Sequence, residues 1–173
     1  MNRGDRGVAA ALVGAAGMWL CACSARADVV ANWNFNALAA PVPSVVSADA
    51  GGGSAQLSEF TAGLGVLAGT DVNAWAGDAA GQGLVITGSG QNGRAIVLEV
   101  RTQGLAGLSF SVAARRSASG FAEAAVEAWD GAAWRRAGTI DASTTQWQVH
   151  AFDLRAMTFL NDAPSARIRV LLE

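Results

Sequence analysis

Two tryptophans lie on either side of a turn signal in the stretch "EAAVEAWDGAAWRRAG". The Asp-Gly dipeptide at 130–131 favours a tight β-hairpin, because both residue types tolerate the positive φ angles of such turns. With a loop of two or four residues, Trp129 faces Trp134 across the hairpin and Glu127 faces Arg136. An outward pair of indole rings beside charged groups makes an apolar platform on which a sugar ring can stack. We expect these four residues to form a ligand-binding surface.

The face on which the tryptophans lie follows from the register of this hairpin. The opposite choice of faces would bury Glu123 and Glu127, whose charges need water or a partner. The inward residues are therefore expected to be Ala124, Val126 and Ala128. Three alternatives stay open, because tryptophan is usually mostly buried: the pair covers a loop, protects a sheet edge or turns inward at a bulge.

Carboxylates and the single histidine lack the spacing that catalysis needs. Glu123 and Glu127 share a strand face, but four residues at about 3.3 Å each separate their backbones by about 13 Å, beyond the roughly 5 to 9.5 Å of glycosidase pairs. His150 and Asp153 are three positions apart, so they lean toward opposite strand faces. We expect His150 to be a surface or edge residue and predict no catalytic residue and no enzyme. A hydrolase is kept as the third alternative.

Two further patterns could hold a cofactor or a metal. The Gly-x-Gly-x-x-Gly match at 88–93 precedes "RAIVLEV", a strand sequence rather than a helix, so it predicts a hairpin loop and not a nucleotide site. Asp71, Asn73 and Asp78 offer oxygen ligands, but their spacing departs from an EF-hand at Trp75. We expect no cofactor and no metal centre, with a structural calcium ion here as a minor alternative.

The first 27 residues have the three parts of a signal peptide. A basic start is followed by an apolar run at 8–20, and Ala25-Arg26-Ala27 matches the A-x-A cleavage motif. The apolar run is shorter than the roughly 20 residues of a membrane helix and no second run follows, so no membrane span is expected. We expect cleavage after Ala27 and secretion. The alternative is a lipid anchor on Cys23, because residues 20–23 resemble a lipobox.

Cleavage after Ala27 determines which reactive and charged side chains the mature protein keeps. Both cysteines precede the cut, so disulfides and thiolate catalysis are excluded. The chain has 12 basic and 14 acidic side chains, of which three arginines and one aspartate lie in the leader, leaving a formal charge of about −4. Nucleic-acid binders normally carry a basic stripe, so that class is excluded.

Short segments with alternating apolar residues fill the rest of the chain. In "VVANWNFN", Trp33 and Phe35 fall on the inward face. Residues 37–53, rich in Pro and Gly, are expected to form a long surface loop. Further strands are predicted at 55–61, 83–87, 95–101, 107–114, 121–129, 134–140, 147–154 and 166–172. This pattern predicts an all-β fold, an antiparallel two-sheet β-sandwich, with residues 28–173 as one domain.

Four segments carry a resemblance to a known group of proteins. The segments "VVANWNFN", "LSFSVAARRSASGFAEAAVEAWDG", "WQVHAFDL" and "ARIRVLL" resemble the secreted β-sandwich modules of PEP-CTERM-type bacterial surface proteins, which are similar in layout to jelly-roll carbohydrate-binding modules. The resemblance implies a jelly-roll-like fold. Such modules usually continue past the "RIRV" strand into a last strand and often a sorting tail, whereas this sequence stops at Glu173. We expect a shortened copy without the sorting tail, its last strand an exposed edge.

Export, fold and the tryptophan pair together favour a non-catalytic secreted or cell-surface binding module. Polysaccharide is the expected ligand class. The alternative is a structural or matrix-interaction module that contacts surface-matrix components and binds no small molecule. Neither hypothesis involves a nucleic-acid partner.

The leader is testable by the mass of the exported protein. We expect intact-mass analysis of protein from the native host to show a chain that begins at Asp28. A mass that includes a lipid on Cys23, or all of residues 1–27, would contradict the predicted cleavage.

Overall fold

The computed structural model describes residues 18–23, 27–72, 74 and 78–173. These residues form antiparallel β-strands connected by turns and two short 3-10 helices, η1 (Ser89–Gln91) and η2 (Thr158–Leu160), without an α-helix. The prediction of an all-β fold is therefore confirmed. None of the described segments is a helix long and apolar enough to cross a membrane.

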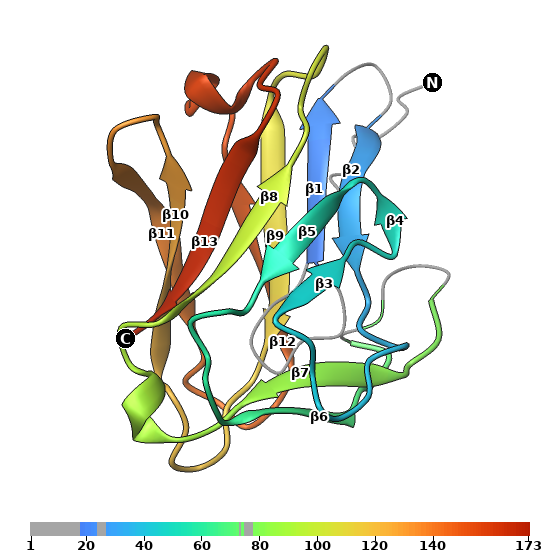
Figure 1. Ribbon diagram of the computed structural model, residues 1–173, viewed down its shortest axis with the longest axis vertical. Coiled ribbons are helices and arrows are strands. Elements are labelled where there is room, and N and C mark those ends of the chain that lie inside the picture. The colour runs from blue at the N-terminus through green and yellow to red at the C-terminus, as the bar shows by residue number, and fades with distance from the viewer. Residues whose placement is uncertain (1–17, 24–26, 73, 75–77) are drawn as a thin grey trace, which may run out of the picture.

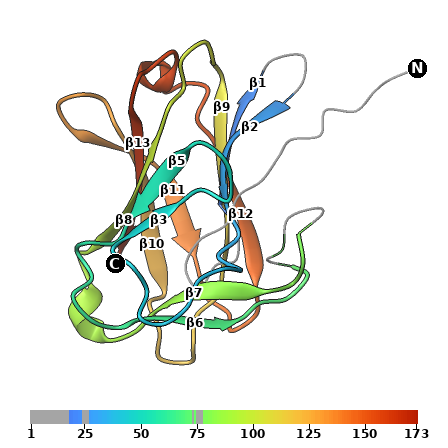
Figure 2. The same ribbon diagram turned by 45° about the vertical axis from the view of Figure 1, so that its right-hand side comes forward.

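The strands are arranged in two large sheets and one small sheet (Figure 1). The five-stranded sheet has the order β12 (Gln148–Asp153), β9 (Leu108–Ala114), β1 (Met18–Cys23), β2 (Ala27–Trp33) and β4 (Ala50–Gly51). The six-stranded sheet has the order β11 (Trp134–Asp141), β10 (Glu123–Trp129), β13 (Ala166–Leu172), β8 (Ala95–Val100), β5 (Gly53–Gln56) and β3 (Val45–Ser47). Strands β6 (Leu64–Ala68) and β7 (Gln82–Ile86) form the small sheet, which lies across one end of the molecule (Figure 2).

One hydrophobic cluster contains buried residues of both large sheets and of the small sheet. The predicted alternation supplies it, because every second residue of a strand points to the same face. On β9 and β13 the predicted inward residues are all buried, namely Leu108, Phe110, Val112, Ala114, Ala166, Ile168, Val170 and Leu172. The outward residues Arg167 and Arg169 stay half-buried.

Trp33 and Phe35 are core residues, as predicted. Their exposed fractions are 0% and 1%. The indole N–H of Trp33 donates to the carbonyl oxygen of Val46 at 3.0 Å, so the ring connects β2 to β3 of the other large sheet. This hydrogen bond satisfies the one polar group that burial of a tryptophan brings into a core.

Three expectations about local structure are wrong. The predicted loop 37–53 contains the short strands β3 and β4, whose two or three residues are too few to show a periodic pattern. The 88–93 stretch is not a hairpin loop, because β7 pairs with β6 and not with β8. Strand β13 is an interior strand hydrogen-bonded to both β10 and β8, so the expected exposed edge is absent there.

Strand β1 lies within the predicted leader, residues 1–27. It pairs antiparallel with β2 on one side and with β9 on the other. Cleavage after Ala27 would therefore remove an interior strand of the five-stranded sheet, and it would cut the chain at the first residue of β2.

Truncation of the buried indole is the sharpest test of this core. We expect Trp33→Ala to lower the free energy of unfolding by about 3–5 kcal/mol, through the lost apolar contacts and the cavity left behind. Chemical denaturation followed by fluorescence measures the change. Val149→Ala, at a side chain that is 51% exposed on β12, is the control and should leave the midpoint nearly unchanged. An unaltered midpoint for Trp33→Ala would show that β2 is peripheral.

Candidate functional site

The β10–β11 hairpin places the two tryptophans side by side. Trp129 and Trp134 are paired in register, and their ring centroids lie 5.4 Å apart at an interplanar angle of 62°. Asp130 closes the four-residue loop, because its Oδ1 accepts the backbone N–H groups of Ala132 at 2.8 Å and Ala133 at 2.7 Å. Gly131 has a φ of 100°, which explains the glycine of the turn signal. The hairpin thus has the predicted register at its turn.

Two arginines from β13 lie over the indole rings. The guanidinium carbon of Arg167 is 4.8 Å from the ring centroid of Trp129, and that of Arg169 is 4.5 Å from the centroid of Trp134. Both distances are within the range of a cation–π interaction. Both tryptophans are half-buried, and their rings meet edge to face beneath these guanidinium groups, so the pair does not present one flat apolar surface.

The charged residues flanking the tryptophans have other partners than the sequence suggests. Glu127 and Arg136 are opposite each other in register, but the carboxylate of Glu127 binds Arg169 at 2.6 Å. Arg136 forms two hydrogen bonds to Glu173, at 3.0 and 2.9 Å. This contact lowers the pKa of Glu173 and raises the pKa of Arg136.

The pairing of β10 with β11 is irregular next to Glu127, the residue that binds Arg169 in place of Arg136. A shift of register between Val126 and Glu127 pairs Val126 with Gly138, which indicates a β-bulge in the hairpin. On the other side of β10, β13 places Arg169 in register with Glu127. The hairpin sequence alone shows only one of the two neighbours of β10, so Arg169 was missed. The outward Arg167 and Arg169 of "ARIRVLLE" were the only sequence signal for these partners.

A cleft of about 430 Å³ opens beside Trp129. Its lining combines two aromatic side chains, two carboxylates, a guanidinium and a hydroxyl, and consists of Glu99, Trp129, Asp130, Gly131, Phe159, Ser165 and Arg167. Glu99 of β8 is in register with Arg167 and accepts a hydrogen bond from the Ser165 hydroxyl at 2.6 Å. Phe159 of η2 is 38% exposed. Of the four predicted site residues, only Trp129 lines this cleft.

Asp130 remains a carboxylate across the physiological range. Backbone hydrogen bonds from Ala133 and Ala132, together with Arg135, lower its pKa to about 2. A carboxylate held ionised in this way accepts hydrogen bonds and does not act as a general acid near neutral pH. Its Oδ1 already accepts two backbone N–H groups and its Oδ2 binds Arg135, which leaves about one of its roughly four acceptor positions for a ligand hydroxyl.

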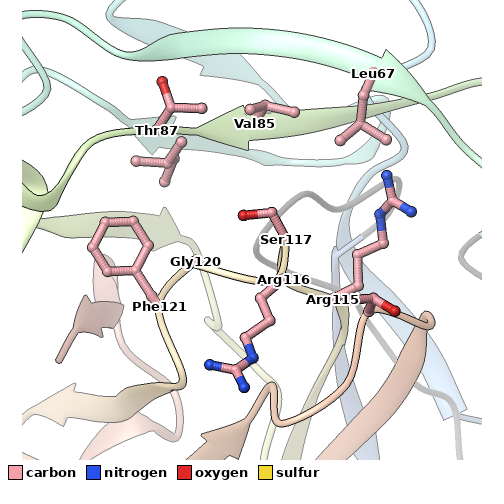
Figure 3. A pocket seen from close by; sticks show the side chains of 10 residues that line it. Leu67, Val85, Thr87, Arg115, Arg116, Ser117, Gly120 and Phe121 are labelled. Carbon is pink, nitrogen blue, oxygen red and sulfur yellow. The ribbon is translucent and has the colours of Figure 1, made fainter.

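A second hollow lies at the end of the molecule covered by the small sheet (Figure 3). It has a volume of about 240 Å³ and adjoins a more open one of about 660 Å³. Leu67 and Val85 face Phe121 across it, while the side chains of Arg115 and Arg116 extend in different directions. Arg115 lies 5.4 Å from the ring centroid of Trp147. Because its charged groups do not converge on one point, this hollow is the poorer candidate for a binding site.

His150 lies on edge strand β12 in register with Val112, and its Nε2 is buried without a hydrogen-bond partner among the described residues. Burial lowers the pKa of His150. Asp153, which the sequence analysis considered with it, binds Arg155 at 2.6 Å, and its pKa is about 2.

The described residues contain no group of three or more His, Cys, Asp or Glu side chains placed to hold a metal ion. Of the candidate calcium ligands, Asn73 lies outside the described residues. Asp78 accepts a hydrogen bond from the amide of Asn32 at 3.4 Å. The geometry of the described part thus gives the calcium hypothesis no support.

The lowered pKa of His150 has a measurable consequence for stability. Because the folded-state pKa is below the unfolded value of about 6.5, the unfolded chain binds more protons in this range. The free energy of unfolding should therefore fall as the pH drops from 7 toward 5. Asp130 and Asp153 titrate mainly at lower pH, so they contribute little in this window. Denaturant unfolding at several pH values should give a flatter profile for His150→Gln, and a wild-type profile that is flat or rises toward pH 5 would contradict the assignment.

Comparison with known protein families, with curated proteins and with solved structures returns no match.

Proposed function

We propose that this protein is a non-catalytic, secreted or cell-surface binding module with a β-sandwich fold of the jelly-roll type, and that it binds polysaccharide in the cleft beside Trp129. The observation that carries the proposal is the composition of that cleft. Aromatic, anionic, cationic and hydroxyl groups meet there in one concavity. The cleavage motif at Ala27 and the resemblance of four strand segments to secreted surface modules support the location.

The residues that line the cleft can contact both the apolar ring face and the hydroxyl groups of a sugar. The C–H face of a pyranose ring is apolar and packs on an aromatic ring, for which Trp129 and Phe159 are available. Its hydroxyls need acceptors and donors at the rim. Glu99 and Asp130 accept hydrogen bonds and Arg167 donates them, so a ring held in the cleft has partners of both kinds.

The shape of the cleft favours a polymer over a small metabolite. Ligand pockets for small molecules usually enclose most of the ligand surface. This cleft is open, and its walls come from the neighbouring strands β8, β13 and β10 and from η2, so a sugar unit held there stays partly exposed, as a unit within a longer chain must. We expect modest affinity, because an open cleft desolvates less of each sugar unit.

The contact between arginine and tryptophan favours the alternative, a structural or matrix-interaction module without a small-molecule ligand. Arg167 and Arg169 already occupy positions over the indole rings. In this alternative the arginine and tryptophan side chains stabilise the outer face of the sheet and contact other chains. The binding experiment below separates the two functions.

A polysaccharide array followed by calorimetry tests the proposal. For a glycan identified on the array, we expect Trp129→Ala and Phe159→Ala each to weaken binding about ten-fold or more, because both remove cleft walls. A ten-fold loss corresponds to about 1.4 kcal/mol. Trp134→Ala should have a smaller effect, since Trp134 is not part of the lining.

Phe121→Ala is the matched control, because it removes an aromatic side chain from the hollow at the other end of the molecule. It should leave the glycan affinity unchanged, and circular dichroism of every variant checks the fold. The absence of any glycan hit, or a hit that is indifferent to Trp129→Ala and Phe159→Ala, would favour the structural module.

A further inference from the structure

We propose that the space between β2 and β9 is a strand-acceptor site: in the protein cut after Ala27, an extended segment of a partner polypeptide takes the place of β1. The proposal rests on the predicted leader and is independent of glycan binding. It concerns the five-stranded sheet, whereas the cleft beside Trp129 is lined by residues of the other large sheet and its connections.

The position of β1 makes this strand different from an ordinary terminal strand. It is not at an edge but between β2 and β9, with six residue pairs to β2 and five to β9 (Figure 1). The two pairings are both antiparallel. Residues 18–23 thus use both of their backbone edges in the sheet, and cleavage after Ala27 separates all of them from the rest of the chain.

Removal of β1 leaves two facing rows of backbone N–H and C=O groups. Neighbouring strands are about 4.8 Å apart, so β2 and β9 are separated by about twice that distance and cannot bond to each other without a rearrangement. Unpaired backbone groups are costly when buried and form a template for another strand when they are accessible. Strand β2 has little other support in its sheet, because it shares only two residue pairs with β4.

The chemistry of the site selects a polypeptide as the occupant. The facing edges of β2 and β9 each carry backbone N–H donors and C=O acceptors. An extended peptide backbone can hydrogen-bond to both edges, as in other cases of strand addition. The occupant must run antiparallel to both neighbours, as β1 does. A sugar or a lipid has no such regular series of groups.

The side chains of β9 add sequence requirements. Phe110 and Val112 are fully buried on the inner face, so the partner residues opposite them must be apolar. Ser111 lies between them on the other face, 1% exposed, and its hydroxyl has no hydrogen-bond partner in the described part of the chain. A polar residue opposite Ser111 would satisfy this hydroxyl. The preferred occupant is therefore a segment of about six residues with alternating apolar and polar positions.

Cutting the full chain after it has folded tests the proposal. A protease site placed within residues 24–26 allows the link between β1 and β2 to be opened in the folded protein. The probe is a fluorescent peptide with the sequence of residues 17–24, in which Ser replaces Cys21 and Cys23. We expect the leader fragment to stay bound after the cut and then to exchange with the probe, as followed by anisotropy and size-exclusion chromatography.

The matched control is the same peptide with Leu20→Pro. Proline lacks the backbone N–H and clashes in the interior of a sheet, so its binding should be at least ten-fold weaker. Hydrogen exchange should show that residues 27–33 and 108–114 are protected with the probe bound and lose protection when the site is emptied.

Three outcomes would overturn the proposal. The first is unchanged protection of β2 and β9 after the leader fragment has left, which would mean that the two strands pair directly. The second is equal binding of the probe and the proline peptide, which would exclude strand pairing. The third is an exported protein that retains residues 18–23 by mass, because its site would then be filled by its own chain. None of these outcomes affects the glycan experiment.

Discussion

The alternation of side chains along β13 is the constraint on which both the core and the cleft depend. Its inward residues are buried in the hydrophobic cluster, and its outward residues Arg167 and Arg169 contact the tryptophans. Because β13 is hydrogen-bonded on both edges, a shift by one residue would break two ladders and bury two guanidinium groups. The apolar residues of β13 therefore set the register of this strand, and the register places the positive charge of Arg167 in the lining of the cleft.

The two arginines differ in how firmly they are held. Arg169 and its partner Glu127 have side chains that are 24% and 14% exposed, so water screens this ion pair little. Arg167 has the ring of Trp129 on one side and Glu99 in register on the other. A cation–π contact contributes about 0.5–1 kcal/mol when exposed and about 2 kcal/mol when desolvated, and the half-buried Arg167 lies between these limits. Reorienting Arg167 toward a ligand would cost its contacts with the indole rings, whereas moving Arg169 would also break its ion pair with Glu127.

Local sequence patterns predicted the strands well and the pairing between distant strands poorly. The alternation around Phe110 and Ile168 is long enough to identify a strand and its buried face. The Asp-Gly signal was enough to predict the partner of Trp129, because the two strands of a hairpin are adjacent in sequence. The contact of Glu127 with Arg169 spans 42 residues and depends on which strand lies beside β10, which no local pattern encodes. The cleft was missed for the same reason, since four separate segments of the chain line it.

The two large sheets are connected through Trp33, and this determines how the proposed strand site can influence the rest of the molecule. Trp33 belongs to β2 beside the strand site, and its indole donates to Val46 in β3 of the other sheet. An occupant that binds only the folded chain raises the free energy of unfolding with the logarithm of its concentration once that concentration exceeds its dissociation constant. None of the residues that line the cleft belongs to β2, because they come from β8, β10, β13, η2 and the adjoining loops. Coupling between the two sites therefore acts through the population of folded protein, not through a rearrangement of the cleft.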